Sequence, residues 1–442
     1  MSTAPSGWCW RRGIGCLVVE GEKPVATYTE ADMKTTAPSS SDSVAGEGDP
    51  QAMDQAADEH APSSLVSLSI KNFAHLQSVN LDFGDLTILV GPQGAGKSLA
   101  LQWLKLGLDG RQIVEILKQS GYTTDKPDVL IEHIFGEGMA TAWHNSTKVQ
   151  FDGLNITPKS LQGAGDGIEK CFFIPAHRAL LITDGWALPF QKVPRTTPAV
   201  ARLFSQSLYD RFSSKDSGVL FPVERRLKKE IRDQIDAAVF HGGTVGIQED
   251  SQHAKRLQLV HGAMHLPFMT WTSGQREFTP LLLGLYDLLP RTNQRKHKMT
   301  DWIVIEEPEM GLHPKAITAV LLLVLDLLWR GYRVVLSTHS PHVLTMVWMM
   351  QRLKEAQADY KLVCKAFGTE PGPMMEVAKA ALTKTYRVHL LAFDQSGKVS
   401  STNISSLDPF DDDERVAEWG GLTQYSSAFA EAVSSAVNAA DS

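Results

Sequence analysis

The sequence predicts an α/β fold with a mixed β-sheet core and an inserted helical and hairpin subdomain. The run Leu86–Val90 is almost continuously apolar, ends at a glycine-rich loop and is followed by helical spacing over Leu99–Leu108, which is typical of a buried strand that leads into a helix. Later in the chain, apolar runs at Trp302–Ile305 and Tyr332–Ser337 alternate with a helical segment at Pro314–Trp329. Strands that alternate with helices indicate an α/β sheet.

The remaining elements can be expected in chain order. Leu65–Ile70 alternates apolar and polar residues, as a half-buried strand does, and residues 140–175 hold several short strand-like pieces. Residues 197–240 have helical spacing and Gly242–Leu266 has the pattern of a hairpin, so together they predict the inserted subdomain. Ser273–Leu289 predicts a further helix, and the rest of the chain gives weaker signals.

Composition and these patterns predict six segments. The two ends are acidic, with net charges of −6 and −7, and the part between them carries +6, which permits a polyanionic ligand without requiring one. The expected segments are a disordered acidic start at 1–62, an N-terminal lobe at 63–178, a helical and hairpin insertion at 179–268, a C-terminal lobe at 269–345, a C-terminal extension at 346–405 and an acidic tail at 406–442.

Cysteine usage and hydropathy favour a cytoplasmic protein. The four cysteines, Cys9, Cys16, Cys171 and Cys364, have no metal-like spacing and suggest no disulfide framework. The longest apolar stretch, Ala316–Trp329, is too short to span a bilayer and contains Asp326. We therefore expect no membrane partner.

The loop after the first buried strand has the features of a phosphate-binding site. Its sequence matches G-x4-G-K-S in full, and glycines allow backbone N–H groups to turn inward around phosphate oxygens at a helix N-terminus. Lys97 is expected to reach the β- and γ-phosphates, and the Ser98 hydroxyl to ligate Mg²⁺. We predict that ATP with Mg²⁺ contacts Gly91, Pro92, Gln93, Gly94, Ala95, Gly96, Lys97, Ser98 and Leu99.

A second apolar strand delivers two consecutive carboxylates at its C-terminal end, where α/β folds bind ligands. Because side chains alternate along a strand, Glu306 and Glu307 cannot do the same work. Glu306 is expected to hold Mg²⁺ through its water shell, and Glu307 to polarise the attacking water.

Two shorter motifs complete the set. Ser273-Gly274-Gln275 opens an apolar helix, and by itself it would most often be only a helix cap. His339 follows the apolar strand Val334–Ser337, and by itself it would most often be structural. After a P-loop and a Glu-Glu strand, a γ-phosphate-sensing role for His339 is the better interpretation.

In this order, the P-loop, the Ser-Gly-Gln turn, Glu306-Glu307-Pro308-Glu309 and Thr338-His339-Ser340 resemble the ABC-type ATPase heads of the SMC, RecF and OLD families. The resemblance covers roughly residues 65–345 and implies that two heads sandwich two ATP molecules. Ser273 and Gly274 would then contact the γ-phosphate held by the P-loop of the partner, with a separate effector protein under the control of the ATP cycle.

The sequence departs from these families at several places. Gln93 stands where they usually have Asn, Glu306 stands where Asp is commoner, and only Gln150 and Gln162 are available as Q-loop candidates. Phe173–Arg178 resembles a Pro-Ala-x-Arg segment of stand-alone bacterial ATPases that often serve phage defence.

Other function classes remain as alternatives. The insertion between Arg178 and Ser273 is too short for a long coiled coil, and the run Asp411–Glu414 is better explained as a solvated acidic stretch than as a nuclease metal site. Basic residues at Arg225-Arg226, Lys228-Lys229 and Arg291–Lys298 could contact DNA phosphates or could simply be solvated. The runner-up is therefore a DNA-repair or recombination ATPase that binds DNA directly, and a transporter subunit is less favoured.

Overall fold

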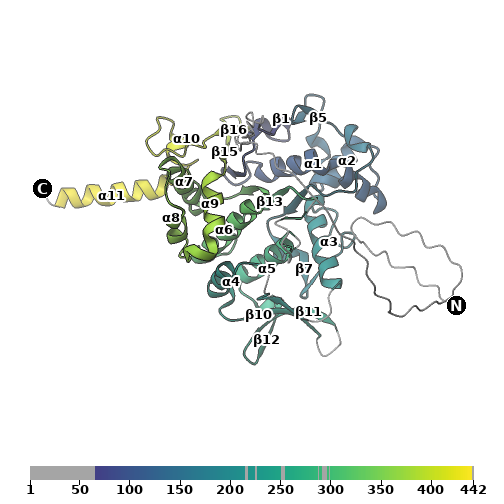
Figure 1. Ribbon diagram of the computed structural model, residues 1–442. Coiled ribbons are helices and arrows are strands. Elements are labelled where there is room, and N and C mark those ends of the chain that lie inside the picture. Colours follow the sequence, from purple (N-terminus) through teal and green to yellow (C-terminus); the bar gives the residue numbers. More distant parts are fainter. Residues whose placement is uncertain are drawn as a thin grey trace, which may run out of the picture. The chain divides into compact units, whose positions relative to one another are not determined.

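A ten-stranded mixed sheet forms the centre of the computed structural model, which describes residues 65–214, 218–223, 226–249, 254–286, 288–290, 296, 297 and 299–440 (Figure 1). The predicted disorder of residues 1–62 lies outside these ranges. The strands of this sheet, in spatial order, are β5 (Leu154–Ile156), β4 (Lys148–Phe151), β1 (Ser67–Phe73), β2 (Leu76–Asp82), β16 (Val399–Asn403), β15 (Tyr386–Phe393), β3 (Leu86–Val90), β14 (Arg333–Ser337), β13 (Trp302–Glu306) and β6 (Cys171–Ile174).

Parallel and antiparallel pairing divide this sheet into two parts. β15, β3, β14, β13 and β6 are parallel neighbours, whereas β1 pairs antiparallel with both β2 and β4. The carboxyl ends of β3, β13 and β14 therefore lie at one edge, as the sequence predicts for a nucleotide site.

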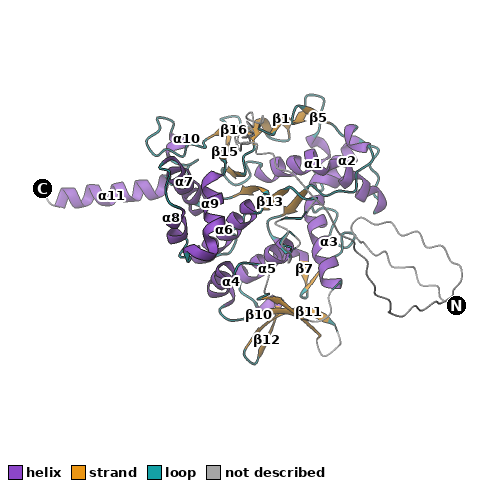
Figure 2. Ribbon diagram, in the orientation of Figure 1, coloured by secondary structure: helices purple, strands orange, loops and turns teal. Residues whose placement is uncertain are grey.

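Helices cover both faces of the sheet (Figure 2). Successive residues of β13 belong to different core clusters, Ile303 and Ile305 to one and Val304 to the other, because strand side chains alternate between faces. One face is covered by α1 (Lys97–Gln119) and α2 (Pro127–Phe135). The other face is covered by α5 (Ser273–Leu285), α6 (Pro314–Trp329), α7 (Pro341–Glu355) and α9 (Pro371–Thr383).

The inserted segment is less helical than the sequence predicts. The helical spacing over residues 197–240 becomes α3 (Ala199–Ser213) and α4 (Lys229–Ile235), separated by the strand β9 (Gly218–Phe221). The predicted hairpin is a meander of β10 (Thr244–Glu249), β11 (Lys255–His261) and β12 (Met264–Pro267), and β9 adds a fourth strand beside β10. The error has a physical reason, because β9 gains its structure from pairing with β10 and not from its own short sequence.

The region after the last predicted strand contributes two strands to the main sheet. β15 pairs with β3 and β16 pairs with β2, so these strands join the two parts of the sheet. Between β14 and β15 the chain forms α7, α8 (Tyr360–Ala366) and α9, and after β16 it forms α10 (Glu414–Ala417) and α11 (Gln424–Ala440). Figure 1 shows α11 extending away from the other helices.

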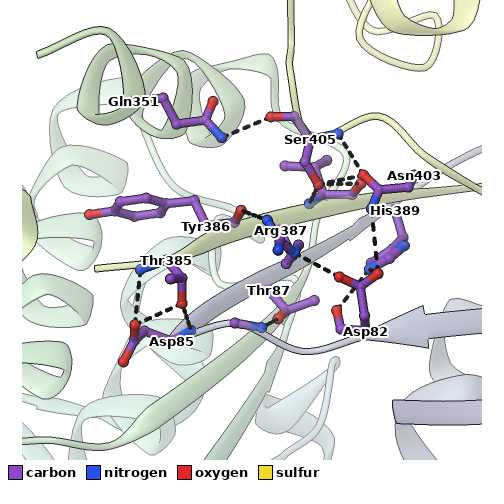
Figure 3. Close-up of polar contacts among 12 residues, drawn as sticks. Asp82, Asp85, Thr87, Gln351, Thr385, Tyr386, Arg387, His389, Asn403 and Ser405 are labelled. Atoms are coloured by element: carbon purple, nitrogen blue, oxygen red, sulfur yellow. Dashed lines mark hydrogen bonds and ion pairs between the residues drawn. The ribbon is translucent and has the colours of Figure 1, made fainter. Parts of the chain in front are cut away.

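A polar network anchors these late strands (Figure 3). Asp85 accepts hydrogen bonds from the N–H and hydroxyl of Thr385, at 2.9 and 2.8 Å. Asp82 accepts one from Arg387 Nε at 2.6 Å, and its backbone carbonyl lies 2.9 Å from Nε2 of His389. Among the described residues, no helix is both long enough and apolar enough to cross a membrane.

Candidate nucleotide site

The glycine-rich loop connects β3 to α1 in a conformation that requires glycine. Gly91, Gly94 and Gly96 have φ angles of 143°, 79° and 80°, which side chains disfavour. Gly91 also lacks space for a side chain, because a Cβ there would lie 2.1 Å from the carbonyl oxygen of Leu391 in β15. The late strand β15 therefore packs directly against the start of the loop.

Lys97 is buried at the start of α1. Its Nζ donates hydrogen bonds to the carbonyl oxygens of Gly91, at 2.8 Å, and Pro92, at 3.1 Å. Burial lowers the pKa of Lys97, and nearby carboxylates oppose that change, in decreasing order those of Glu307, Glu309 and Glu306. The fold therefore brings this ammonium group beside the carboxylates that follow β13.

Glu306 is the last residue of β13 and is only 5% exposed. Its Oε2 accepts a hydrogen bond from the backbone N–H of Ala176 at 3.1 Å, while Oε1 has no hydrogen bond of good geometry to the described residues. Burial raises the pKa of Glu306, and the hydroxyl of Ser98 and the N–H of Ala176 act against that rise. Ser98 and Glu306 are thus neighbours, as the motifs predict.

Glu307 has different surroundings from Glu306. Its φ angle is 42°, an unusual value for a residue with a side chain, and its N–H donates to the carbonyl of Ser337 at 2.9 Å. Its Oε1 lies 3.7 Å from Nε2 of His339. Two residues that the sequence places 32 positions apart thus face each other at the same sheet edge.

Glu309 organises the loop that carries His339. Its Oε1 accepts hydrogen bonds from the hydroxyl of Thr338 at 2.6 Å and from the N–H of His339 at 2.8 Å. The sequence shows Glu309 only as part of a motif and predicts no role for it. The signal that could have identified it is a third carboxylate, two residues beyond Glu307, in a segment that must turn back towards β14.

The segment after β6 also joins the site. Arg178 is fully buried and donates to the carbonyl oxygens of Glu306 at 2.8 Å and Glu307 at 3.2 Å. The Pro-Ala-x-Arg resemblance drew attention to Arg178 but predicted no contact with the glutamates, because the contact depends on β6 and β13 being neighbours.

The Ser-Gly-Gln turn forms the N-terminus of α5. Thr272 is the N-cap of a capping box, in which its hydroxyl accepts the backbone N–H of Gln275 and the side-chain oxygen of Gln275 accepts the backbone N–H of Thr272. Ser273 is exposed, whereas a Cβ at Gly274 would lie 2.7 Å from the carbonyl oxygen of Gly311. Gln275 also donates to the carbonyl of Val239 at 3.0 Å, so its side chain is engaged within the chain.

Other predicted residues lie apart from this group or are used elsewhere. Gln150 bonds to Asn155 on β5, and Gln162 bonds to Thr124, so both side chains are engaged away from the carboxylates that follow β13. Arg226 donates to the carbonyl of Leu289, and the ammonium group of Lys228 lies over the ring of Trp329. The runner-up DNA-binding hypothesis therefore gains no open basic surface from these two residues, and Arg225 and most of Arg291–Lys298 lie outside the described ranges.

The donor set fits ATP with Mg²⁺. A hydroxyl and a carboxylate are the hard oxygen ligands that Mg²⁺ prefers, and the ion usually takes only one or two such groups from a protein and the rest from phosphates and water. The backbone of the loop, the N-terminus of α1 and Lys97 match the charge of a triphosphate. Ser98 and Glu306, with its Oε1 available, would hold the ion.

Comparisons with known proteins agree with these features. Residues 67–175 match a family model described as "AAA domain", and residues 208–345 match one described as "AAA domain, putative AbiEii toxin, Type IV TA system". The "Old nuclease" of Escherichia phage P2 is 35% identical to this chain over 346 residues. That alignment covers 64% of this chain and 57% of the phage protein, so the chain spans little more than half of its relative.

The solved structures that match this chain include heads of SMC proteins, at low identity and low TM-score. The "SMC head domain from Thermotoga maritima" has 13% identity and a TM-score of 0.33, over 77% of this chain and 98% of that one. The "Crystal structure of the SmcHead bound to the C-winged helix domain of ScpA" has 11% identity and a TM-score of 0.39, over 76% and 96% of the two chains.

The two family models and the curated relative support the predicted assignment to ABC-type ATPases of the SMC, RecF and OLD-like group. The AAA-domain matches indicate ATP hydrolysis as the enzyme activity. The predicted α/β P-loop fold with a mixed sheet is confirmed.

Proposed function

We propose that two copies of this chain enclose two Mg²⁺-ATP molecules, hydrolyse them, and so control a separate effector protein in bacterial phage defence. The observation that carries the hydrolytic part is the gathering of Lys97, Glu306, Glu307 and His339 at the carboxyl edge of one sheet. Three motifs that are far apart in the sequence supply these four groups, which phosphoryl transfer to water needs.

Each side chain has a distinct part in the proposed reaction. Lys97 and the loop N–H groups hold the β- and γ-phosphates, and Ser98 with Glu306 holds Mg²⁺, which when bound neutralises charge on those phosphates. Glu307 accepts a proton from the attacking water. At the same time the water oxygen bonds to the γ-phosphorus, and the bond from the γ-phosphorus to the β–γ bridging oxygen breaks. His339, 3.7 Å from Glu307, contacts the γ-phosphate from the adjacent strand.

The position of the Ser-Gly turn supports the proposed dimer. A helix N-terminus offers backbone N–H groups and a positive dipole, and Ser273 adds an exposed hydroxyl, all suited to the outer face of a γ-phosphate. Gly274 keeps that turn against Gly311, in the loop that follows Glu309. In the related families this turn comes from the opposite subunit, which supports the same arrangement here.

Phage defence and an effector are supported by relationship and not by geometry. One matching family model is described by a toxin–antitoxin system, and the curated relative is a phage-encoded nuclease. Within the described residues, no group of three or more His, Cys, Asp or Glu side chains is placed to hold a metal ion. The resemblance of Phe173–Arg178 to stand-alone bacterial ATPases supports the assignment of the effector activity to a separate protein.

The shared site can be tested with mixed dimers. Ser273→Arg should disable the site on the P-loop of the partner, whereas Lys97→Ala should disable the site on its own P-loop. A heterodimer of the two variants has one doubly damaged site and one intact site. We expect such heterodimers, purified through two different tags, to regain up to about half of the wild-type ATPase rate, while each variant alone is inactive.

A different result would identify which part of the proposal is wrong. If Ser273 only caps its own helix, the variant loses about 0.5–2 kcal/mol of stability and mixing restores nothing. Full hydrolysis by Lys97→Ala alone would instead contradict the P-loop as the catalytic site.

A further inference from the structure

Arg178 is an arginine with no exposed surface, a rare position for a charged residue unless its charge and hydrogen bonds are compensated. Its closest carboxylate contact is long, 3.9 Å from Nε to Oε2 of Glu277. The guanidinium group instead donates to four backbone carbonyl oxygens, those of Pro175, Glu306, Glu307 and Glu277, at distances of 3.0, 2.8, 3.2 and 3.2 Å. Its function in the fold is therefore to fix backbone positions.

These four carbonyls belong to three separate parts of the site. Pro175 follows β6, Glu306 ends β13 and Glu307 comes directly after it, and Glu277 lies one turn into α5. A second hydrogen bond connects the segment of Arg178 to α5, because Oε2 of Glu277 accepts the N–H of Ala179 at 3.3 Å. A planar guanidinium group with five N–H donors can join several acceptors in a fixed geometry, which an ammonium group cannot do.

The backbone that Arg178 holds is itself strained. Glu307 has a φ angle of 42°, which costs free energy and persists only where the surroundings enforce it. The N–H of Glu307 is held by Ser337 and its carbonyl by Arg178. Loss of Arg178 would release the carbonyl side of this residue and allow its side chain to leave the position opposite His339.

We propose that Arg178 is a positioning residue that serves both ATP sites of the dimer. It sets the direction of Glu307 for the site on its own P-loop, and through Glu277 it sets α5, whose Ser-Gly turn completes the site of the partner. This inference rests on the proposed function, because it assumes that α5 acts across the dimer.

The first test separates positioning from nucleotide binding. Arg178→Gln should lower kcat on the order of 10²-fold, the scale expected when a reacting group is misplaced by about 1 Å. The dissociation constant for a fluorescent ATP analogue should change by less than about threefold, since the P-loop is untouched. Arg178→Lys should regain little activity, because a single ammonium group cannot reach all four carbonyl oxygens.

A matched control addresses the cost of removing a buried arginine. Arg202 is also fully buried, but it lies over the rings of Tyr122 and Phe190 and bonds to the carbonyl of His133. Arg202→Gln should lower the thermal midpoint as Arg178→Gln does, with kcat retained at temperatures where both variants are folded. An equal loss of kcat in the two variants would overturn the positioning role.

The second test addresses the link to α5. In a heterodimer, one chain carries Arg178→Gln and the other carries Ser273→Arg. One of the two sites then takes its P-loop and Glu307 from the Ser273→Arg chain and its Ser-Gly turn from the Arg178→Gln chain, so none of the groups that form this site is itself substituted. If Arg178 acted only on its own Glu307, this site would work and recovery would equal that of the Lys97→Ala pairing. We expect recovery well below that value, and equal recovery would overturn the link to α5. Failure of the Lys97→Ala pairing itself would instead count against the shared-site dimer.

Discussion

Two adjacent glutamates, Glu306 and Glu307, differ in their burial and in the groups that they contact. Glu306 is buried, accepts an N–H from Ala176 and has a raised pKa because of burial. Glu307 is partly exposed and lies beside His339. The reversal at the end of β13, where φ of Glu307 becomes positive, directs the two side chains into these separate environments.

This difference predicts different consequences for the same substitution. Glu307→Gln keeps the shape but removes the proposed base, so ATP should bind and persist while hydrolysis falls by about 10²- to 10⁴-fold. Glu306→Gln removes the proposed ligand of Mg²⁺ and should weaken the Mg²⁺-dependent part of ATP binding. Equilibrium binding with and without Mg²⁺, together with single-turnover hydrolysis, measures both effects. Equal loss of nucleotide binding in the two variants would contradict the division of roles.

At the scale of elements, β15 carries a buried histidine that contacts the last residue of β2. His389 on β15 is 1% exposed, its Nε2 lies 2.9 Å from the carbonyl oxygen of Asp82, and its Nδ1 has no hydrogen-bond partner among the described residues (Figure 3). The charged groups that face it are Asp82, whose Oδ1 lies 3.3 Å away, and Arg387. Burial lowers the pKa of His389 below its ordinary value of 6.5, and the nearby Asp82 only partly opposes this.

The pH dependence of stability follows from that shift. Since the unfolded chain takes up the His389 proton more readily than the folded one, the contribution of His389 to the unfolding free energy is complete above pH 6.5 and is lost as the pH falls. His389→Gln keeps a donor for the carbonyl of Asp82 and should reduce the loss of stability between about pH 7.5 and about pH 5.5. Urea unfolding of both proteins at these pH values is the measurement. Glu306 and Asp326, carboxyl groups with raised pKa values, act in the opposite sense, but they are present in both proteins and cancel in the comparison. Parallel curves of unfolding free energy against pH for the two proteins would contradict the prediction.

At the scale of the whole molecule, the last two strands of the chain lie in the middle of its central sheet. β15 and β16 lie between β3 and β2 and connect the parallel and antiparallel parts of the sheet. Leu391 of β15 also lies against Gly91 of the phosphate-binding loop. The described side chains of α11, by contrast, are all exposed, including Tyr425, Phe429 and Val433.

Two truncations should therefore have opposite outcomes. A chain that ends at Thr423 loses α11 and little packing, so it should remain folded and keep its thermal midpoint within about 2 °C. A chain that ends at Thr383 loses β15 and β16 and exposes the edges of β2 and β3, which is a template for aggregation. Expression, gel filtration and thermal unfolding of both chains provide the test. A folded, ATP-binding protein that ends at Thr383 would show that the late strands are dispensable.

The sequence by itself predicted the chemistry that we propose for this protein, and it determined the local units that would carry this chemistry. The phosphate-binding loop, the Glu306-Glu307 strand end, the Ser273 turn and the His339 strand end were all recognisable because each depends on residues adjacent in the chain. Buried strands were recognisable for the same reason, since the almost continuously apolar run Leu86–Val90 leaves few alternatives.

Only the tertiary structure decided which of these units meet. Three contacts join residues that lie far apart in the sequence. Arg178 donates hydrogen bonds to the carbonyl oxygens of Glu306 and Glu307, the N–H of His339 donates to Glu309, and β15 pairs with β3. β9, β15 and β16 were not predicted because short strands acquire their stability from their neighbours. Hydrogen bonds to backbone carbonyls also leave no mark in the residue type of the acceptor, and this is why a fully buried arginine at the centre of the site could be noticed in the sequence but not understood from it.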